Sequence, residues 1–455
     1  MGRLNRGTVK TRKIRLLRNP KLGFALALVC AASMWFYVSH ILVPYQRADA
    51  AAHERPRGNL SDLYPRWLGA RELLLHDRNP YSREVTREIQ MGYYGRELDA
   101  NRPGDPKDQQ GFAYPVYVAF LLAPTISLPF AVVSVVFQWL LVIVTAASVL
   151  LWFRAIGWHA RPIVLVSVVV LTLGSFPALQ ALKLQQLTLI VAAVISAAMA
   201  LLVSGHLFSA GALLAVASIK PQLVVPIAAF LLLWAVSDWR RRQRFVWGLG
   251  LIFTCLFGGG EILLPGWFGK FLSAAHDYQN YAGSMSMLDV LLTLWWGRIL
   301  TVILMAGVTA VAWRFRKEEA GSRMISLLMA LVLAVTVIII PMFAPYNYVL
   351  VLPSLLLLGE SWSQLWKRDV FARAGCLLTA AAVAWPWVAA IGLSVASIFL
   401  SPQAVQQYWR LPLYTIAKVP LPIVCLIPLS ILIISTWQGS EAPEVESEQP
   451  TGLVA

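Results

Sequence analysis

The chain has 455 residues, of which 58% are hydrophobic and only 13% charged, and its mean hydropathy is +0.65. This amount of charge cannot cover a water-soluble surface of such a size, and apolar stretches of roughly 17–25 residues, the length that spans a bilayer, follow one another along the chain. A soluble enzyme, a secreted disulfide scaffold and a disordered protein are therefore excluded, and the sequence predicts an all-α polytopic membrane protein, because a helix satisfies its own backbone hydrogen bonds in lipid.

The formal net charge of +15 would suggest nucleic acid as the partner of a soluble protein. In a membrane protein, Lys and Arg gather in cytoplasmic and juxtamembrane segments, where they also attract anionic lipid. We therefore expect contact with membrane lipid and no nucleic-acid partner. The four Cys lie in apolar stretches and the six His are scattered, so neither a disulfide framework nor a metal site is indicated.

The first hundred residues give the orientation. Residues 1–22 carry eight Lys or Arg and no acid, so they are predicted to form a basic cytoplasmic tail. Residues 23–43 form the predicted first transmembrane helix, which then exits outward. Residues 44–111 carry 11 acids and 11 Lys or Arg, and this charge balance predicts a large first extracytoplasmic loop. A loop of this length usually carries function or a small subdomain.

Residues 112–437 are predicted to form a multi-helix transmembrane domain, which brings the total to roughly 10–13 transmembrane helices. Residues 438–455 are acidic and are predicted to be a disordered cytoplasmic tail. Three basic clusters mark cytoplasmic connections. They are Arg240 to Arg244, Arg314 to Lys317, and Lys367-Arg368.

The stretch 112–130 leaves the number of membrane crossings between the outer loop and the next basic residues unsettled. If Arg154 and Arg161 are also cytoplasmic, this stretch cannot make a full crossing and must be re-entrant or part of a broken helix. With this topology the polar helix ends near Gln185, Lys220 and Asn347 converge with the 44–111 loop on the outer face. That convergence predicts a site there.

The stretch from Ser61 to Tyr81 is the most informative part of the loop. Ser61 or Asp62 is a plausible N-cap for an amphipathic helix running to about Leu75, and Asn79-Pro80 is a stop signal. Four apolar residues at helical spacing, Leu63, Trp67, Ala70 and Leu74, could lie on the bilayer. From spacing alone, Asp62 could be only a helix cap.

A set of short motifs follows in order along the chain. They are Asp62, Trp67, a small residue at Gly69 or Ala70, Leu73-Leu74, Asn79-Pro80-Tyr81, Phe112-Ala113-Tyr114-Pro115, Leu121 to Pro124, Gln185 to Thr188, Ala210-Gly211, Lys220-Pro221 and Arg240 to Arg244. Together they resemble the pattern of glycosyltransferase family 87, the polyprenol-phosphate-mannose-dependent mannosyltransferases, and cover most of residues 20–300. Two motifs depart from that pattern. The family's Asn-Gln-Ser is reduced to Gly283-Ser284-Met285-Ser286, and Asn347 lies in a late motif without His, which bears on donor and acceptor identity.

The resemblance implies a GT-C-like fold and transfer of a hexose, most simply mannose, from a polyprenyl-phosphate sugar. The acceptor would be a glycolipid or a cell-envelope glycan at the outer face of a bacterial plasma membrane. Asp62 would be the catalytic general base, with inversion at the anomeric carbon. No cofactor beyond the lipid-phosphate donor, and no metal, is expected.

Further residues are candidates for substrate binding, each with a structural alternative. Lys220 could contact the donor phosphate or snorkel to the interface. Arg66 and Arg71 could do the same or lie on a solvated helix face. Gln185 and Gln186 could bind sugar hydroxyls or cap a helix end. The remaining candidates are Tyr81, His276 and Asn347.

Two other function classes compete with the transferase. Broken helices with internal polar groups also occur in secondary transporters and lipid or glycolipid flippases, although here the acids cluster in an outer loop rather than within helices. A non-catalytic scaffold of envelope assembly would share the fold and differ at Asp62. The sequence sets no oligomeric state.

Overall fold

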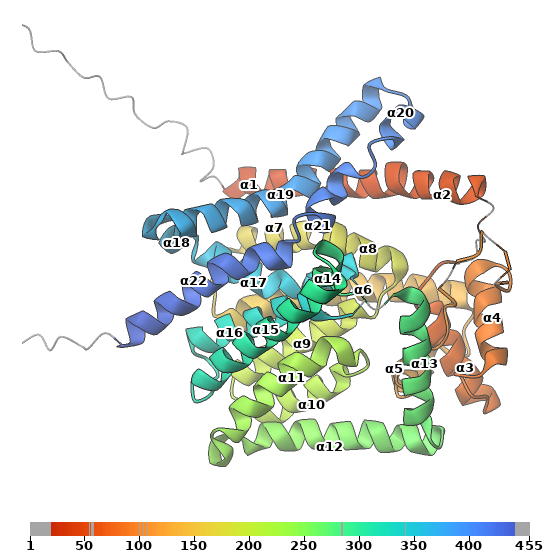
Figure 1. Cartoon of the computed structure of the whole chain (residues 1–455), viewed down its shortest axis with the longest axis horizontal. Helices are drawn as coiled ribbons and strands as arrows, with labels where there is room; N and C mark the ends of the chain where they lie inside the picture. The colour runs from red at the N-terminus through yellow and green to blue at the C-terminus, as the bar shows by residue number, and fades with distance from the viewer. Residues whose placement is uncertain are drawn as a thin grey trace, which may run out of the picture.

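The computed structural model describes residues 20–441 except for residues 54, 56–58, 100, 103, 107, 284 and 342. The predicted basic tail up to residue 19, the acidic tail from residue 442 and the departure at Ser284 lie outside the described residues. Within the described part the chain is 79% helix without any strand (Figure 1), which confirms the all-α polytopic class.

Six segments of the described chain are long and apolar enough to cross a bilayer. The first, Pro20–Ala52, joins α1 (Pro20–Phe36), the π-helical η2 (Tyr37–Leu42) and α2 (Val43–Ala52), so it continues past the predicted end at Val43. The others are α6 (Phe130–Ile156), α12 (Trp239–Leu263), α15 (Leu294–Arg314), α19 (Val370–Phe399) and the segment Pro402–Gln438, which contains α20 (Pro402–Gln406), η5 (Leu411–Leu413), α21 (Tyr414–Ala417) and most of α22 (Leu421–Glu441).

Two bent helix pairs raise the number of candidate spans to as many as eight. In the first pair, α7 (Pro162–Leu173) meets α8 (Phe176–Leu184) at 55°; in the second, η4 (Pro345–Val351) and α17 (Leu352–Glu360) meet α18 (Trp362–Arg368) at 63°. Four apolar helices are shorter: α9 (Thr188–Val203), α10 (Leu207–Ala217), α11 (Pro221–Val236) and α16 (Arg323–Ile339). The predicted total of ten to thirteen is reached only if these shorter helices are included.

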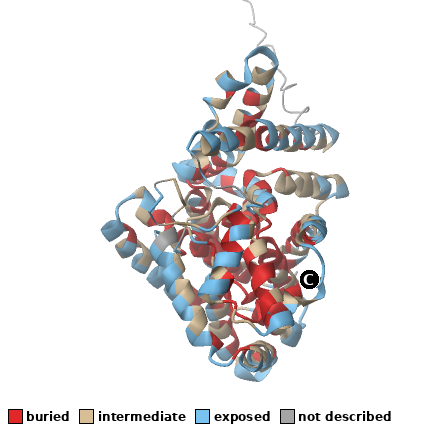
Figure 2. Ribbon diagram, turned by 90° about the vertical axis from the view of Figure 1, so that its right-hand side faces the viewer, coloured by how far each residue is buried: buried red, intermediate tan, exposed pale blue. Residues whose placement is uncertain are grey.

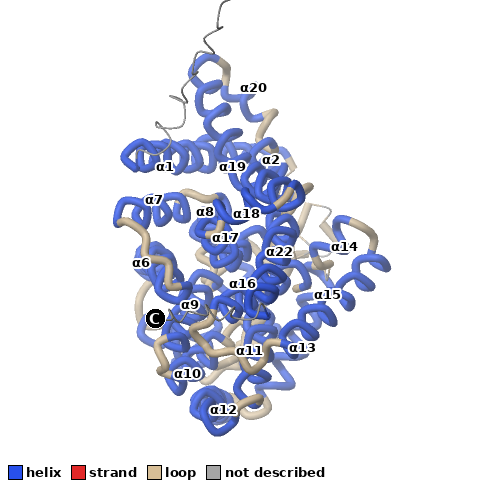
Figure 3. Tube along the Cα trace, turned by 90° about the vertical axis from the view of Figure 1, so that its left-hand side faces the viewer, coloured by secondary structure: helices blue, strands red, loops and turns tan. Residues whose placement is uncertain are grey.

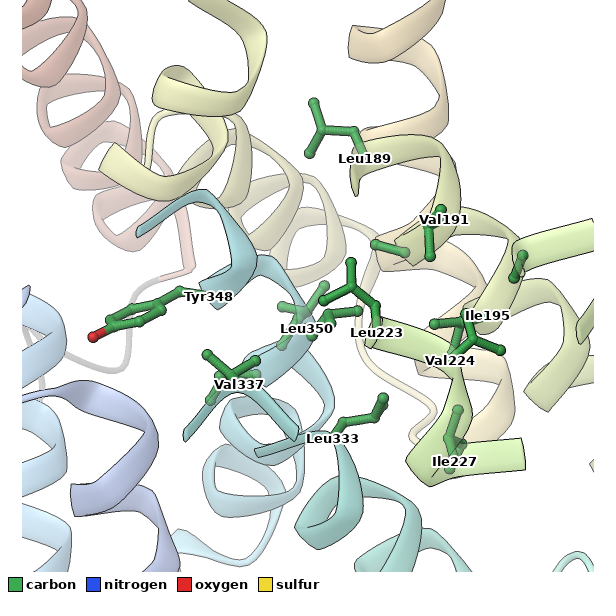
Figure 4. Close-up of a cluster of buried hydrophobic side chains, with 14 of the residues drawn as sticks. Leu189, Val191, Ile195, Leu223, Val224, Ile227, Leu333, Val337, Tyr348 and Leu350 are labelled. Atoms are coloured by element: carbon green, nitrogen blue, oxygen red, sulfur yellow. The ribbon is translucent and has the colours of Figure 1, made fainter. Parts of the chain in front are cut away.

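The core lies where the shorter helices meet. Most residues of α9 and α16 are buried, and Figure 2 shows the buried residues gathered at the centre of the molecule. Apolar side chains from α9, α11, α16 and η4 pack there, among them Ile195, Ile227 and Leu333 (Figure 4). The long helix α12 lies at the periphery (Figure 3) and exposes apolar side chains such as Ile262, as expected of a surface that faces lipid.

The stretch 112–130 does not make a full crossing. Before α6 begins at Phe130, it contains only α5 (Val118–Leu122) and the 3-10 turn η3 (Ala123–Thr125). Five helical residues rise about 8 Å, far less than the roughly 30 Å of a bilayer core. The outcome agrees with the argument from the basic residues.

The predicted outer loop folds into two further helices, α3 (Tyr64–His76) and α4 (Arg83–Tyr94). They lie at the same end of the molecule as α13 (Trp267–Ala282), which follows α12 (Figure 1). The short α14 (Met287–Leu291) precedes α15. The end that carries α3, α4 and α13 contains the site described next.

Candidate functional site

The Asp62 carboxylate is not a helix cap. Helix α3 begins at Tyr64, and its N-cap residue Leu63 makes no side-chain cap. Asp62 instead accepts hydrogen bonds from the Tyr93 hydroxyl (3.1 Å) and from the side-chain amide of Gln186. The prediction of Ser61 or Asp62 as N-cap is therefore wrong, because the helix starts after both residues. The Ser61 hydroxyl accepts the backbone N–H of Leu63 at 3.3 Å, outside the helix, and donates to Gln185 Oε1 at 2.5 Å.

A sharp helix end separates the roles of Gln185 and Gln186. Helix α8 stops at Gln185, which has a left-handed backbone (φ 53°). The Gln185 amide donates to Ser134 O (2.6 Å) and Oγ (2.9 Å), so it joins α8 to α6. The Gln186 amide has a different task, because it donates to Asp62 and accepts from Lys220 Nζ at 2.7 Å.

Lys220 is buried, with 5% of its surface exposed. It stands directly before α11, and its ammonium group also donates to Thr188 Oγ1 at 2.6 Å. The ring centroids of Tyr346 and Tyr114 are 5.3 and 5.8 Å from Nζ. The side chain therefore ends inside the protein rather than at a water interface, and neutral groups and aromatic faces surround its charge.

Arg66 brings a second buried cation to the same place. Its guanidinium lies 4.5 Å from the centroid of the Tyr114 ring and donates to the Asp62 backbone carbonyl at 2.6 Å. Its Nε is buried without a hydrogen-bond partner in the described part of the chain. A buried donor of this kind is costly unless a ligand supplies an acceptor.

Asn347 joins this network through one contact, and the other predicted residues lie around it. Thr188 Oγ1 donates to Asn347 Oδ1 at 3.4 Å. Tyr81 lies beside the network, and its hydroxyl donates to the backbone carbonyl of Tyr114 at 2.6 Å. Arg71 stacks over the Trp67 ring (5.4 Å), and His276 is exposed on α13. The structure gives neither Arg71 nor His276 a contact with Asp62 or Lys220.

The apolar face of α3 packs on protein, which makes its predicted contact with the bilayer wrong. Leu63, Trp67 and Ala70 are buried, and the Trp67 indole donates to the Thr125 carbonyl at 3.2 Å. Gly69 lies so close to Phe112 that an added Cβ would come within 2.3 Å of that ring. This contact presses α3 against residues 108–114, called the strap below.

The strap carries Tyr114 to the two cations and is anchored to α4. The Tyr94 hydroxyl donates to Asp108 O at 2.6 Å, and the Gln90 amide donates to Gln109 O at 3.1 Å. Within the strap, Gln110 has a left-handed backbone, and its N–H and side-chain amide both donate to the Asp108 carboxylate (3.0 and 2.8 Å). The strap thus has a fixed path past α4.

Sequence reasoning did not find Tyr93 and Asp108. Burial raises the pKa of the Tyr93 hydroxyl, and the Asp62 carboxylate raises it further, so Tyr93 stays a protonated donor to Asp62. Burial raises the pKa of Asp108, and nearby Asp62 adds to the effect. A signal existed for Tyr93, because α4 is strongly amphipathic and places Tyr93 on its buried face with Val85 and Ile89.

The assembled groups suit transfer of a group from an anionic carrier. Asp62 is partly exposed and can accept a proton. Lys220 and Arg66 offer two buried positive charges, which favour a departing anion. Within the described residues, no three His, Cys, Asp or Glu side chains are placed to hold a metal ion.

Comparison with known families supports the resemblance read from the motifs. The family model described as glycosyltransferase family 87 matches residues 112–345, slightly more than half of the chain. Gln186 and Lys220 lie inside the matched region, whereas Asp62 and Arg66 precede it. No significant similarity was found to a curated protein or to a solved structure.

Proposed function

Because this chain belongs to glycosyltransferase family 87, and is therefore a multi-pass membrane glycosyltransferase, we propose that it uses a polyprenyl-phosphate sugar as donor. The sugar transferred is a hexose, most simply mannose. The acceptor is a hydroxyl of a lipid-linked or cell-envelope glycan at the outer face of a bacterial plasma membrane. Family membership also sets aside the transporter and flippase alternatives.

One observation carries the proposal. The Asp62 carboxylate and the Lys220 ammonium are held one side chain apart, because the Gln186 amide donates to the first and accepts from the second. A glycosyl transfer from a phosphate carrier needs a base on one side of the anomeric carbon and a cation on the other. The Gln186 bridge sets that separation.

In the proposed step, Asp62 takes the proton of the acceptor hydroxyl, and the oxygen of that hydroxyl forms the new bond to the anomeric carbon. The bond between this carbon and the phosphate oxygen breaks with its electron pair, leaving polyprenyl phosphate, whose negative charge Lys220 and Arg66 stabilise. Attack from the face opposite the phosphate inverts the anomeric configuration. The partly exposed Asp62 then returns its proton to water.

The test is transfer of label by the purified protein in lipid, with radiolabelled polyprenyl-phosphate mannose and a host membrane lipid extract. We expect Asp62→Asn to lower transfer at least about 100-fold, as for loss of a general base. An Asn side chain can still bond to both Gln186 and Tyr93, so the fold should persist. Asp77→Asn is the matched control, because Asp77 is exposed in the same loop and its left-handed backbone (φ 52°) suits Asn.

Each outcome has a distinct meaning. If Asp62→Asn transfers label at the wild-type rate, Asp62 is not the base. If wild type binds the mannose donor without transferring label, parallel assays with polyprenyl-phosphate glucose test the choice of sugar. If wild type binds neither lipid donor, the donor class is wrong.

A further inference from the structure

A large cavity at this end of the molecule is not lined by Asp62. It has a volume of about 1160 Å³ and is lined by α4, by the loop that leads into the strap, and by α13. The volume exceeds the roughly 300–1,000 Å³ of pockets that hold drug-sized ligands. A single monosaccharide would leave most of this space empty.

The lining suits a neutral sugar chain. The described lining residues include four Lys or Arg and four Asp or Glu side chains, so the charges balance. Amide and hydroxyl side chains lie among them, such as Thr86 and Asn280, and the half-buried ring of Tyr81 provides an apolar face. Sugars offer many hydroxyls and apolar ring faces, which this mixture can bind, whereas a polyanion would gain no net attraction from the balanced charges.

The cavity and the Asp62 network share their walls. On α4, Gln90 lines the cavity, and Tyr93, one turn later, donates to Asp62. On the strap, Ala113 lines the cavity, and the ring of Tyr114 lies against Arg66. On α13, Asp277 lines the cavity, whereas the charges of Asp108, Arg66 and Asp62 act on the neighbouring Tyr278.

We propose that this cavity binds the glycan of the acceptor, and that the acceptor is a neutral oligosaccharide of several hexose units rather than a single sugar. The proposal rests on the proposed transferase function and extends it to the acceptor. The terminal unit would reach Asp62 beside Tyr93 and Tyr114, while the preceding units lie along α4 and α13. The cavity thus selects acceptors by length.

The test measures binding without transfer. Saturation-transfer NMR on the full chain in lipid nanodiscs would titrate mannose, glucose and galactose and their linear two- and four-unit oligosaccharides. We expect at least one series to bind roughly tenfold more tightly at four units than at one. The double variant Asp277→Ala with Asn280→Ala should lose most of that gain, since both side chains are exposed and no hydrogen bond within the described chain holds them. Gln279→Ala is the matched control, because Gln279 is exposed on the same helix but does not line the cavity.

The possible failures separate the two proposals. If no series gains affinity with length, or if the double variant binds like wild type, the acceptor assignment is overturned whatever the transfer assay shows. Length-dependent binding by wild type without any transfer would uphold the cavity assignment and count against the donor or the base.

Discussion

At the scale of single residues, the burial of Lys220 has a testable consequence. Its ammonium contacts two neutral acceptors and two aromatic faces, so a phosphate would be its first anionic contact. Lys220→Gln should lower transfer by about 10²–10³, the cost of losing one group that stabilises transition-state charge, and should weaken donor binding. The measurement is transfer rate together with donor affinity.

The control for Lys220 separates binding from folding. Lys183→Gln changes an exposed Lys whose ammonium donates to Gln46, and it should leave transfer unchanged. Removing the buried charge of Lys220 should also leave the thermal midpoint near the wild-type value, because no carboxylate loses an ion-pair partner. A Lys220→Gln protein with wild-type donor affinity would contradict the assignment.

The raised pKa of Asp108 should make the stability of the folded protein depend on pH. Burial raises the pKa of this carboxyl in the folded state, so its contribution to stability is fully present below the ordinary pKa of about 3.9. That contribution is lost as the pH rises through the higher pKa of the folded state. Asp108→Asn does not titrate, so the thermal midpoint of wild type relative to the variant should fall as the pH rises above about 4. A difference that stays constant or reverses would show that Asp108 does not titrate this way.

At the scale of elements, two glycines let α10 and α12 touch. A Cβ on Gly248 would come within 2.0 Å of the Phe208 carbonyl oxygen, and a Cβ on Gly211 within 2.1 Å of that of Phe245. Close approach of this kind is typical of small residues between membrane helices. Gly248→Ala should therefore force the helices apart. We expect it to lower the free energy of unfolding by about 1–3 kcal/mol, which a lower thermal midpoint would report.

The same helix offers the control for that substitution. A Cβ on Gly250 meets nothing within 4 Å, so Gly250→Ala should be neutral or stabilising by up to about 1 kcal/mol through helix propensity. Both variants are followed by thermal unfolding in detergent. Equal midpoints for the two alanine variants would mean that the α10–α12 contact is looser than the structure shows.

Helix α3 illustrates how far sequence reasoning reached. Its apolar spacing and the Asn79-Pro80 signal located the helix and its end, which lies at His76 instead of about Leu75. Its start was wrong because Ser61 and Asp62 bond to residues 124 positions later in the chain, which spacing cannot reveal. Its face was misassigned because apolar residues that pack on protein and on lipid give the same pattern.

In the candidate site, too, the sequence predicted the residues but not their tertiary contacts. The motifs identified Asp62, Gln186 and Lys220 separately, but their order as a hydrogen-bonded chain depends on how α8 ends. The left-handed backbone of Gln185 turns the two neighbouring glutamines to different partners. Tyr93 and Asp108 reach the site only through the packing of α4 and the strap. The amphipathic pattern of α4 marks Tyr93 as buried but does not place it beside Asp62.

At the scale of the whole molecule, the basic clusters gather at the end opposite the site, since Figure 1 shows α18 and the start of α12 at one end and α3, α4 and α13 at the other. The Arg242 guanidinium donates to the carbonyls of Arg316 (2.9 Å) and Lys317 (2.9 Å). Lys367 lines a surface hollow with Arg323. From this end α12 extends about 37 Å, a bilayer's width, toward α13. Because Lys and Arg mark the cytoplasmic side, this arrangement favours an outer position for Asp62.

This orientation can be tested by labelling in intact bacterial cells. In a chain with all four Cys replaced by Ala and transfer activity retained, Met91→Cys would place a thiol on the exposed side of α4, and Lys317→Cys would place one among the basic residues. A membrane-impermeant maleimide should label position 91 directly and position 317 only after permeabilisation. The reverse pattern would place Asp62 in the cytoplasm, where the donor would have to present its sugar on the inner leaflet. Labelling at position 91 would instead restrict donor and acceptor to the outer leaflet, because a carboxylate fixed beside Tyr93 can reach only hydroxyls presented there.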